Sequence, residues 1–143
     1  MINEVIHLEK LNDEEINFLP TLKRVLLKTN PKKPLYAKDI VRGVNKRRED
    51  GLSNYCLTKP FTEARLRKMV NYFRCTATLP VISTSNGYYV SYERDEIISM
   101  IKSLRARADA IYGASDGMDY ILKQKDIVDG NKEIDVFGFE WKD

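Results

Sequence analysis

The sequence predicts a mainly α-helical protein with a small β-hairpin, an α+β chain of 143 residues. Apolar residues recur at helical spacing in residues 62–75, where one face carries Leu66, Met69, Val70 and Phe73. Directly after this helix, Asn86-Gly87 separates two short apolar runs. Asn-Gly is a strong signal for a type I′ hairpin turn, in which both central residues need positive φ.

Residues 1–34 are expected to form an N-terminal arm and a first helix that packs on the core. Asn12-Asp13-Glu14-Glu15 is typical of a capping box, in which the Asn side chain and a Glu three residues later satisfy free backbone N–H groups. The helix therefore begins near Asp13. Pro20 then breaks it or begins a second helical segment, because proline removes a backbone hydrogen bond from a helix interior.

A second helix is predicted in residues 36–49, with Ala37, Ile40, Val41 and Val44 on its apolar side. Its last turn is basic and contains Lys46, Arg47 and Arg48, so this end is able to contact phosphate groups. Asp50-Gly51 ends the helix, since glycine accepts the left-handed conformation that closes many helices.

The charge distribution is uneven, although the net charge of the whole chain is only +3. Residues 36–78 contain ten basic and four acidic side chains, which gives this segment a net charge of +6. Residues 126–143 contain six acidic and two basic side chains, a net charge of −4. A basic middle indicates a polyanionic partner such as nucleic acid, whereas a solvated surface is the plain alternative.

The side of helix 62–75 opposite its apolar stripe is predicted to face outward with basic and amide groups. Arg67 and Lys68 suit phosphate or a guanine edge, and Asn71 suits the paired hydrogen bonds of adenine. Polar residues of the hairpin turn are expected to touch the DNA backbone. The candidate DNA-contacting residues are Lys46, Arg47, Lys59, Thr62, Glu63, Arg65, Arg67, Lys68, Asn71, Ser85 and Asn86.

These segments together resemble the winged helix-turn-helix modules of phage and prophage proteins. The resemblance is carried by residues 66–74, by Leu79-Pro80-Val81-Ile82-Ser83, and by Asn86-Gly87-Tyr88-Tyr89-Val90. It implies a winged-helix domain in residues 35–92, with an N-terminal helical extension and a long C-terminal helix. It also implies double-stranded DNA binding, sequence-tolerant or sequence-specific, by a transcriptional regulator or a replication accessory. Residues 51–61 make the turn between the two helices longer than in a compact helix-turn-helix.

The C-terminal part is predicted to contain a long helix in residues 93–125 and an acidic aromatic tail in residues 126–143. Apolar residues in the helix alternate in steps of four and three, which forms a heptad-like seam. The seam consists of Ile97, Ile101, Leu104, Ala108, Ile111, Ser115, Met118 and Leu122. Two alternatives remain open, packing within the chain or pairing in a homodimer. The tail either packs on its own domain or docks into a protein partner.

The sequence offers little for catalysis, and we expect no enzyme, no cofactor and no metal site. Gly113-Ala114-Ser115-Asp116-Gly117 matches a nucleophile-elbow pattern, but its surroundings have a helical period and the single His7 lies upstream. Cys56 and Cys75 lack metal-ligand spacing and are expected to be buried thiols. Without an apolar leader or an 18-residue apolar run, a cytoplasmic location without a membrane span is expected. The alternative function is a winged-helix adaptor that binds protein through residues 93–143.

Overall fold

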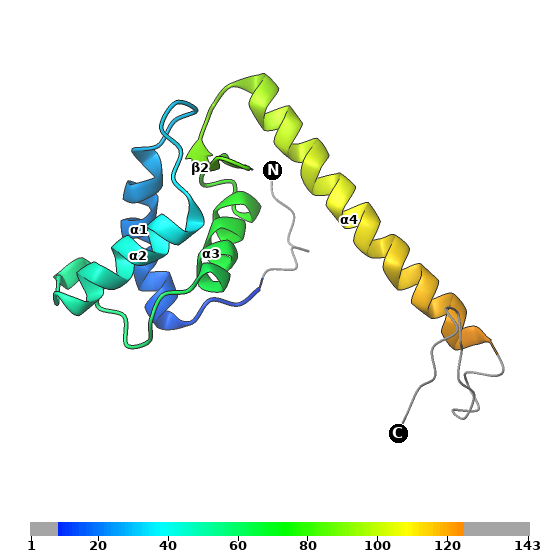
Figure 1. Ribbon diagram of the computed structural model, residues 1–143, viewed down its shortest axis with the longest axis horizontal. Helices are drawn as coiled ribbons and strands as arrows, with labels where there is room; N and C mark the ends of the chain where they lie inside the picture. Colours follow the sequence, from blue (N-terminus) through cyan, green and yellow to red (C-terminus); the bar gives the residue numbers. More distant parts are fainter. Residues whose placement is uncertain (1–8, 125–143) are drawn as a thin grey trace. The chain divides into compact units, whose positions relative to one another are not determined.

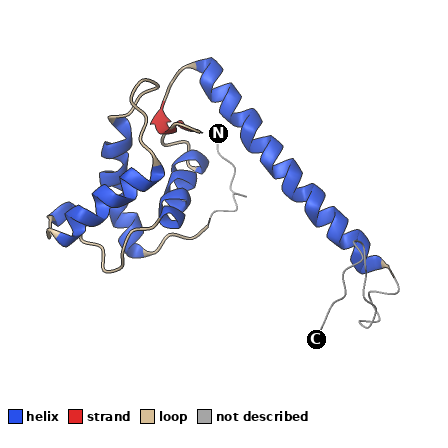
Figure 2. Ribbon diagram, viewed as in Figure 1, coloured by secondary structure: helices blue, strands red, loops and turns tan. Residues whose placement is uncertain are grey.

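The structure, a computed structural model, describes residues 9–124, and the predicted tail in residues 126–143 and His7 lie outside this range. The elements are α1 (Asp13–Leu27), α2 (Ala37–Glu49), the 3₁₀ turn η1 (Ser53–Tyr55), α3 (Glu63–Cys75), β1 (Val81–Thr84), β2 (Gly87–Val90) and α4 (Arg94–Lys123) (Figures 1 and 2). The described chain is therefore mainly helical with a two-stranded antiparallel sheet, as predicted. No helix in this range is both long and apolar enough to cross a membrane.

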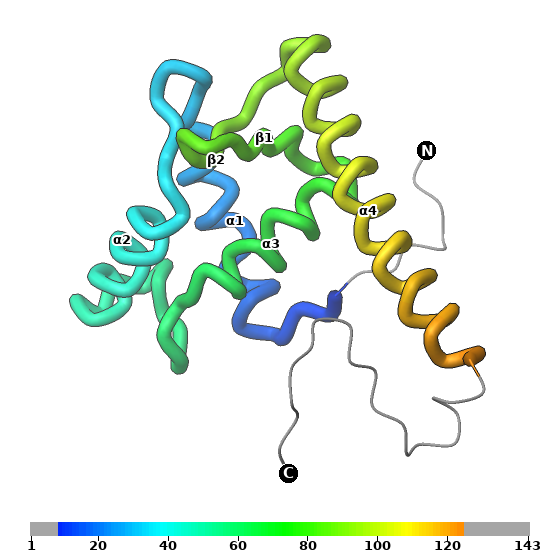
Figure 3. The backbone as a smooth tube through the Cα atoms, turned by 45° about the vertical axis from the view of Figure 1, so that its right-hand side comes forward, coloured from blue at the N-terminus to red at the C-terminus, as the bar shows by residue number. Residues whose placement is uncertain are grey.

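The chain divides into two compact units, Met1–Met100 and Ile101–Asp143, and the boundary between them falls within α4. In the first unit, α1, α2 and α3 surround a shared interior, and the two strands lie near one end of these helices (Figures 1 and 3). The predicted apolar stripe of α3 is buried there, with Leu66 and Met69 completely covered. Phe18, Leu22 and Leu26 of α1 complete the same core.

Helix α1 begins with the predicted capping box. The Asn12 side chain accepts a hydrogen bond from the Glu15 backbone N–H at 2.8 Å, and the Glu15 carboxylate accepts one from the Asn12 backbone N–H at 3.0 Å. The expected break at Pro20 is wrong, because α1 runs continuously through this residue. An interior proline costs a helix about 3 kcal/mol. Phe18 and Leu22 are buried on either side of it, and their burial favours the unbroken helix.

The hairpin is present, but its turn is not the predicted one. The register pairs Val81 with Val90 and Thr84 with Gly87, so the central residues are Ser85 and Asn86. Among the described residues other than glycine, only Ala77 has positive φ, which excludes a type I′ turn here. Gly87, with φ of 115°, instead begins β2.

Gly87 is required by a close approach of the segment before α2. Leu35 and Tyr88 exchange two backbone hydrogen bonds of 2.9 and 2.8 Å, so Leu35 extends the sheet by one residue beside β2. A Cβ atom on Gly87 would lie 2.4 Å from the Leu35 carbonyl oxygen. The hairpin is thereby held against the start of α2, which a sequence pattern alone does not reveal.

Two side chains attach the hairpin to the helices. The Arg74 guanidinium of α3 donates to the Val81 carbonyl at 2.9 Å and to the Ser83 hydroxyl at 3.1 Å. The Val90 backbone N–H donates to the Thr29 hydroxyl, just after α1, at 3.0 Å. The hairpin is therefore attached to α3 through β1 and to the end of α1 through β2.

Candidate nucleic-acid interface

The start of α3 is fixed by two sets of hydrogen bonds. Thr62 caps the helix, its hydroxyl accepting from the Arg65 backbone N–H at 3.1 Å. The Asn45 side chain of α2 donates to the Phe61 carbonyl at 2.9 Å and accepts from the Phe61 N–H at 2.7 Å. A side-chain amide that satisfies both backbone groups of Phe61 holds the start of α3 against α2, so the exposed side of α3 has a defined orientation.

The outer side of α3 presents a row of three polar residues. Glu63, Arg67 and Asn71 follow one another at intervals of four residues, so they lie along one face, and all three are exposed. Within residues 9–124, the side chains of Arg67 and Asn71 form no ion pair and no hydrogen bond. A guanidinium and an amide are therefore available to an external ligand.

Arg65 has a different environment from the one expected. Its guanidinium lies 3.0 Å from a Glu15 oxygen and 3.2 Å from a Glu14 oxygen, both at the start of α1. It also donates to the carbonyls of Lys59 and Pro60 and lies 5.9 Å from the centre of the Phe61 ring. With 15% of its side chain exposed, Arg65 serves to join α1 to α3.

Lys68 belongs to the same group rather than to the outer row. Its ammonium lies 2.8 Å from a Glu15 oxygen, and the Glu15 side chain is only 2% exposed. Burial would raise the pKa of Glu15, but hydrogen bonds from Lys68, the Asn12 backbone and Arg65 lower it below its usual value. The hydrogen bond from Thr58 is the main cause that lowers the pKa of Glu14 to about 2. We call Glu14, Glu15, Arg65 and Lys68 the α1–α3 ion cluster.

A hollow of about 360 Å³ separates the hairpin turn from the starts of α2 and α3. It is lined by Tyr36, Ala37, Lys38, Glu63, Ser83, Thr84, Ser85, Gly87 and Tyr88. Lys38 was not among the candidate residues, although its exposed ammonium lies at this hollow, 5.8 Å from the Tyr36 ring centre. The sequence signal that could have identified Lys38 is its position in the first turn of the helix predicted in residues 36–49. Ser85 lines the hollow as well, while Asn86 is exposed at the turn itself.

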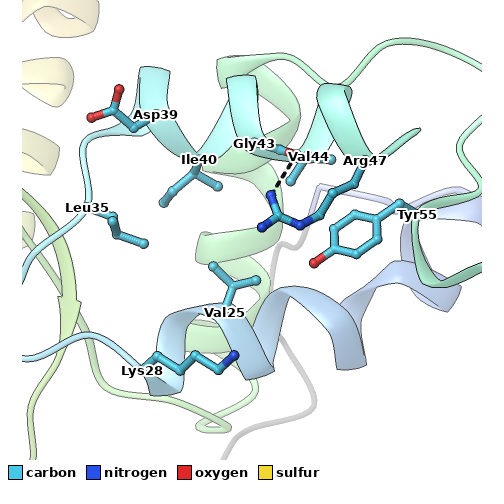
Figure 4. A pocket seen from close by; sticks show the side chains of 9 residues that line it. All are labelled: Val25, Lys28, Leu35, Asp39, Ile40, Gly43, Val44, Arg47 and Tyr55. Atoms are coloured by element: carbon cyan, nitrogen blue, oxygen red, sulfur yellow. Dashed lines mark hydrogen bonds between the residues drawn. The ribbon is translucent and has the colours of Figure 1, made fainter. Parts of the chain in front are cut away.

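Lys46 and Arg47 lie at the other end of α2. At 1.5 Å per residue, Arg47 is about 13 Å along the helix from Lys38. Figure 4 shows that Arg47 donates to the Gly43 carbonyl, at 3.1 Å, and lies beside Tyr55, with 5.7 Å to the ring centre. Here it borders a second hollow, of about 400 Å³, between α1 and α2. The structure therefore does not bring Lys46 and Arg47 together with the hairpin turn.

Exposed charged and polar groups lie on α3, at the hollow and in the segment before α3. Arg67, Lys38 and Lys59 supply exposed cations, Asn71 an amide, and Ser85 a hydroxyl. Among the described residues, no three His, Cys, Asp or Glu side chains are grouped so that they could hold a metal ion. The thiols are less buried than expected, since Cys56 is exposed and Cys75 is half-buried.

The sequence matches no protein-family model, and its comparison with curated proteins and with solved structures finds no match either. Any assignment of function therefore depends on the fold and on the surface of α3 and the hairpin.

Proposed function

We propose that this chain is a winged-helix protein that binds double-stranded DNA through α3 and its hairpin. The order of elements supports this proposal: α1, an extended residue paired with the sheet, α2, α3 and the hairpin. In such a fold, α3 enters the major groove and the hairpin, the wing, lies against the neighbouring backbone. The proteins of phages and prophages that the sequence resembles suggest a transcriptional regulator or a replication accessory.

The proposal depends chiefly on one observation, the exposed row Glu63, Arg67 and Asn71, whose first member lines the hollow at the hairpin turn. In the major groove, Arg67 binds a guanine edge or a phosphate, and Asn71 binds adenine. Glu63 accepts a hydrogen bond from a cytosine amino group. The exposed Lys38 and Lys59 contact phosphates, which adds affinity but no sequence preference.

The first test compares Arg67→Ala with the matched control Arg24→Ala, an exposed arginine of α1 outside the row and the hollow. Binding is measured by fluorescence anisotropy on a random-sequence duplex over a range of salt concentrations. Arg67→Ala should weaken binding. The slope of log affinity against log salt concentration should become shallower by about one, the contribution of a single phosphate contact. Arg24→Ala should behave as the wild type. Equal affinities and slopes for all three proteins would remove α3 from the interface.

Lys68 is unsuitable for this test, because Lys68→Ala also removes a partner of the buried Glu15 and would change stability together with binding. Lys59→Ala avoids this problem, since its ammonium has no ion-pair partner within residues 9–124. When Lys59→Ala is combined with Arg67→Ala, the slope of log affinity against log salt concentration should become shallower by about one more.

A second candidate function, a winged-helix adaptor that binds protein, is favoured by a different observation. The hairpin, residues 81–90, contains neither lysine nor arginine, so it adds no positive charge against a DNA backbone. The titration of the wild type separates the two functions. A folded protein that does not bind duplex DNA at low salt would favour the adaptor, because electrostatic binding is strongest under that condition.

A further inference from the structure

The part of α4 in the second unit exposes several large apolar side chains. Ile111 and Tyr112 are each 69% exposed, Met118 is 72% exposed, and Leu122 is 61% exposed. Helices in water gain most of their stability from packing an apolar face, and contiguous exposed apolar surface usually marks an interaction site. Within the described part of this unit, α4 therefore has an apolar surface that no other described residue covers.

Mostly apolar side chains of α4 form a stripe with a seven-residue repeat. The stripe consists of Ile101, Leu104, Ala108, Ile111, Ser115, Met118 and Leu122. The helix is continuous through all of these residues, so they follow one side of it, as the a and d positions of a coiled coil do. We propose that this stripe, which we call the α4 seam, pairs in antiparallel orientation with the α4 seam of a second copy of the chain.

The distribution of charge along α4 favours antiparallel pairing. The half nearer the first unit carries Lys102, Arg105 and Arg107 against Asp109, whereas the far half carries Asp116 and Asp119 against Lys123. In a parallel pair, the two basic halves would lie side by side and repel each other. In an antiparallel pair, each basic half lies beside an acidic half, and Arg105, Arg107 and Asp119 are the charges that flank the seam and favour this orientation.

One register satisfies both the charges and the part of the seam from Leu104 to Leu122. Leu104 packs against Leu122 of the second copy, Ala108 against Met118, and Ile111 against Ser115. These contacts centre the pair on residue 113, one residue from the middle of the helix in the second unit. Arg105 then lies beside Asp119 of the second copy, since both flank the seam on the same side. In the single chain Asp119 pairs with Lys123 at 2.7 Å, a bond between largely exposed groups that is easily exchanged.

The two glycines of α4 lie outside the proposed contact. Gly113 and Gly117 fall on the side of the helix away from the seam, and an added Cβ would meet no atom within 4 Å at either position. Alanine at both positions should therefore strengthen dimerisation, because it favours the helix without obstructing the contact.

Sedimentation equilibrium of the full chain tests the seam through two matched variants. Ile111→Lys places a charge in the seam, and Tyr120→Lys places the same charge outside it, at a side chain that is 67% exposed. Neither should unfold a protomer, since both residues are exposed. The wild type and Tyr120→Lys should be dimers, and Ile111→Lys should raise the dimer dissociation constant by about a hundredfold or more, because two buried isoleucines are replaced.

Charge reversal tests the orientation. Arg105→Glu and Asp119→Arg should each weaken the dimer, since each places like charges side by side. The double variant should restore it, because the pair is re-formed with its charges exchanged. Single variants without effect, or a double variant weaker than both, would overturn the antiparallel register.

Other occupants of the seam give distinct results that would overturn the proposal. A wild type that remains monomeric at high concentration would mean that another part of the chain or another protein covers the seam. A dimer that Ile111→Lys and Tyr120→Lys weaken equally would mean that the contact lies elsewhere.

Discussion

At the scale of single residues, Glu15 does more for the fold than a capping residue. Its backbone and carboxylate close the capping box of α1, while the same carboxylate binds Arg65 and Lys68 of α3. A buried carboxylate is costly unless its partners satisfy it, and here two cations and a backbone N–H do so. Arg65 and Lys68 are therefore required mainly to hold α3 in place.

This arrangement predicts how stability depends on pH. The pKa of Glu14, about 2, and that of Glu15 both lie below the usual value of 4.5. The unfolded state therefore binds protons before the folded state does as pH falls. The stabilisation is complete above about pH 4.5 and is lost as pH falls towards 2. Urea denaturation between pH 7 and pH 2.5 should show this decline.

The variant Glu15→Gln tests the same cluster at neutral pH. It leaves Lys68 without its acidic partner and should lower the free energy of unfolding by about 3 kcal/mol, the cost of breaking a buried ion pair. Asp39→Asn is the control, because Asp39 and Arg42 form an exposed pair worth less than about 1 kcal/mol. An equal loss in the two variants, or an unchanged acid decline in Glu15→Gln, would show that the cluster adds little.

At the scale of elements, sequence patterns correctly predicted the features that depend only on residues close together in the chain. The capping box, the apolar stripe of α3 and the presence of the hairpin follow from residues a few positions apart. The errors arose where distant residues decide the outcome. Packing of α1 on the core keeps the helix intact through Pro20, and the approach of Leu35 explains Gly87 at the start of β2.

Gly87 provides a prediction for the hairpin. Gly87→Ala should destabilise the fold by more than Gly51→Ala, although both glycines have positive φ. At Gly51 an added Cβ meets nothing within 4 Å, so only backbone strain of about 1–2 kcal/mol is expected. At Gly87 the same strain is joined by a clash with backbone atoms of Leu35. Thermal denaturation of the two variants measures the difference, and equal shifts in Tm would contradict the required close approach.

At the scale of the whole molecule, the net charge of a segment did not indicate how much of that charge is available to a ligand. Residues 36–78 have a net charge of +6, but Glu14 and Glu15 of α1 neutralise Arg65 and Lys68. The Arg74 side chain donates a hydrogen bond to the hairpin, and the Arg47 side chain donates one to the Gly43 carbonyl. The helical period of residues 62–75 was enough to predict that Arg67 and Asn71 lie on the outer face of α3. It could not show which of the other cations the fold itself uses, since their partners are distant in the chain.

The DNA-binding and dimer proposals together predict avidity. Two copies joined at the α4 seam engage one long duplex as a bivalent ligand, so the second contact forms at high effective concentration. Ile111→Lys should therefore weaken binding to a duplex that accommodates two copies, yet bind a duplex of half that length as well as the wild type does. Tyr120→Lys should match the wild type on both, because it keeps the dimer. Anisotropy titrations at one salt concentration give all four comparisons. If Ile111→Lys loses affinity equally on both duplexes, the substitution acts on the DNA contact itself. If it loses none on the longer duplex, the two copies bind independently.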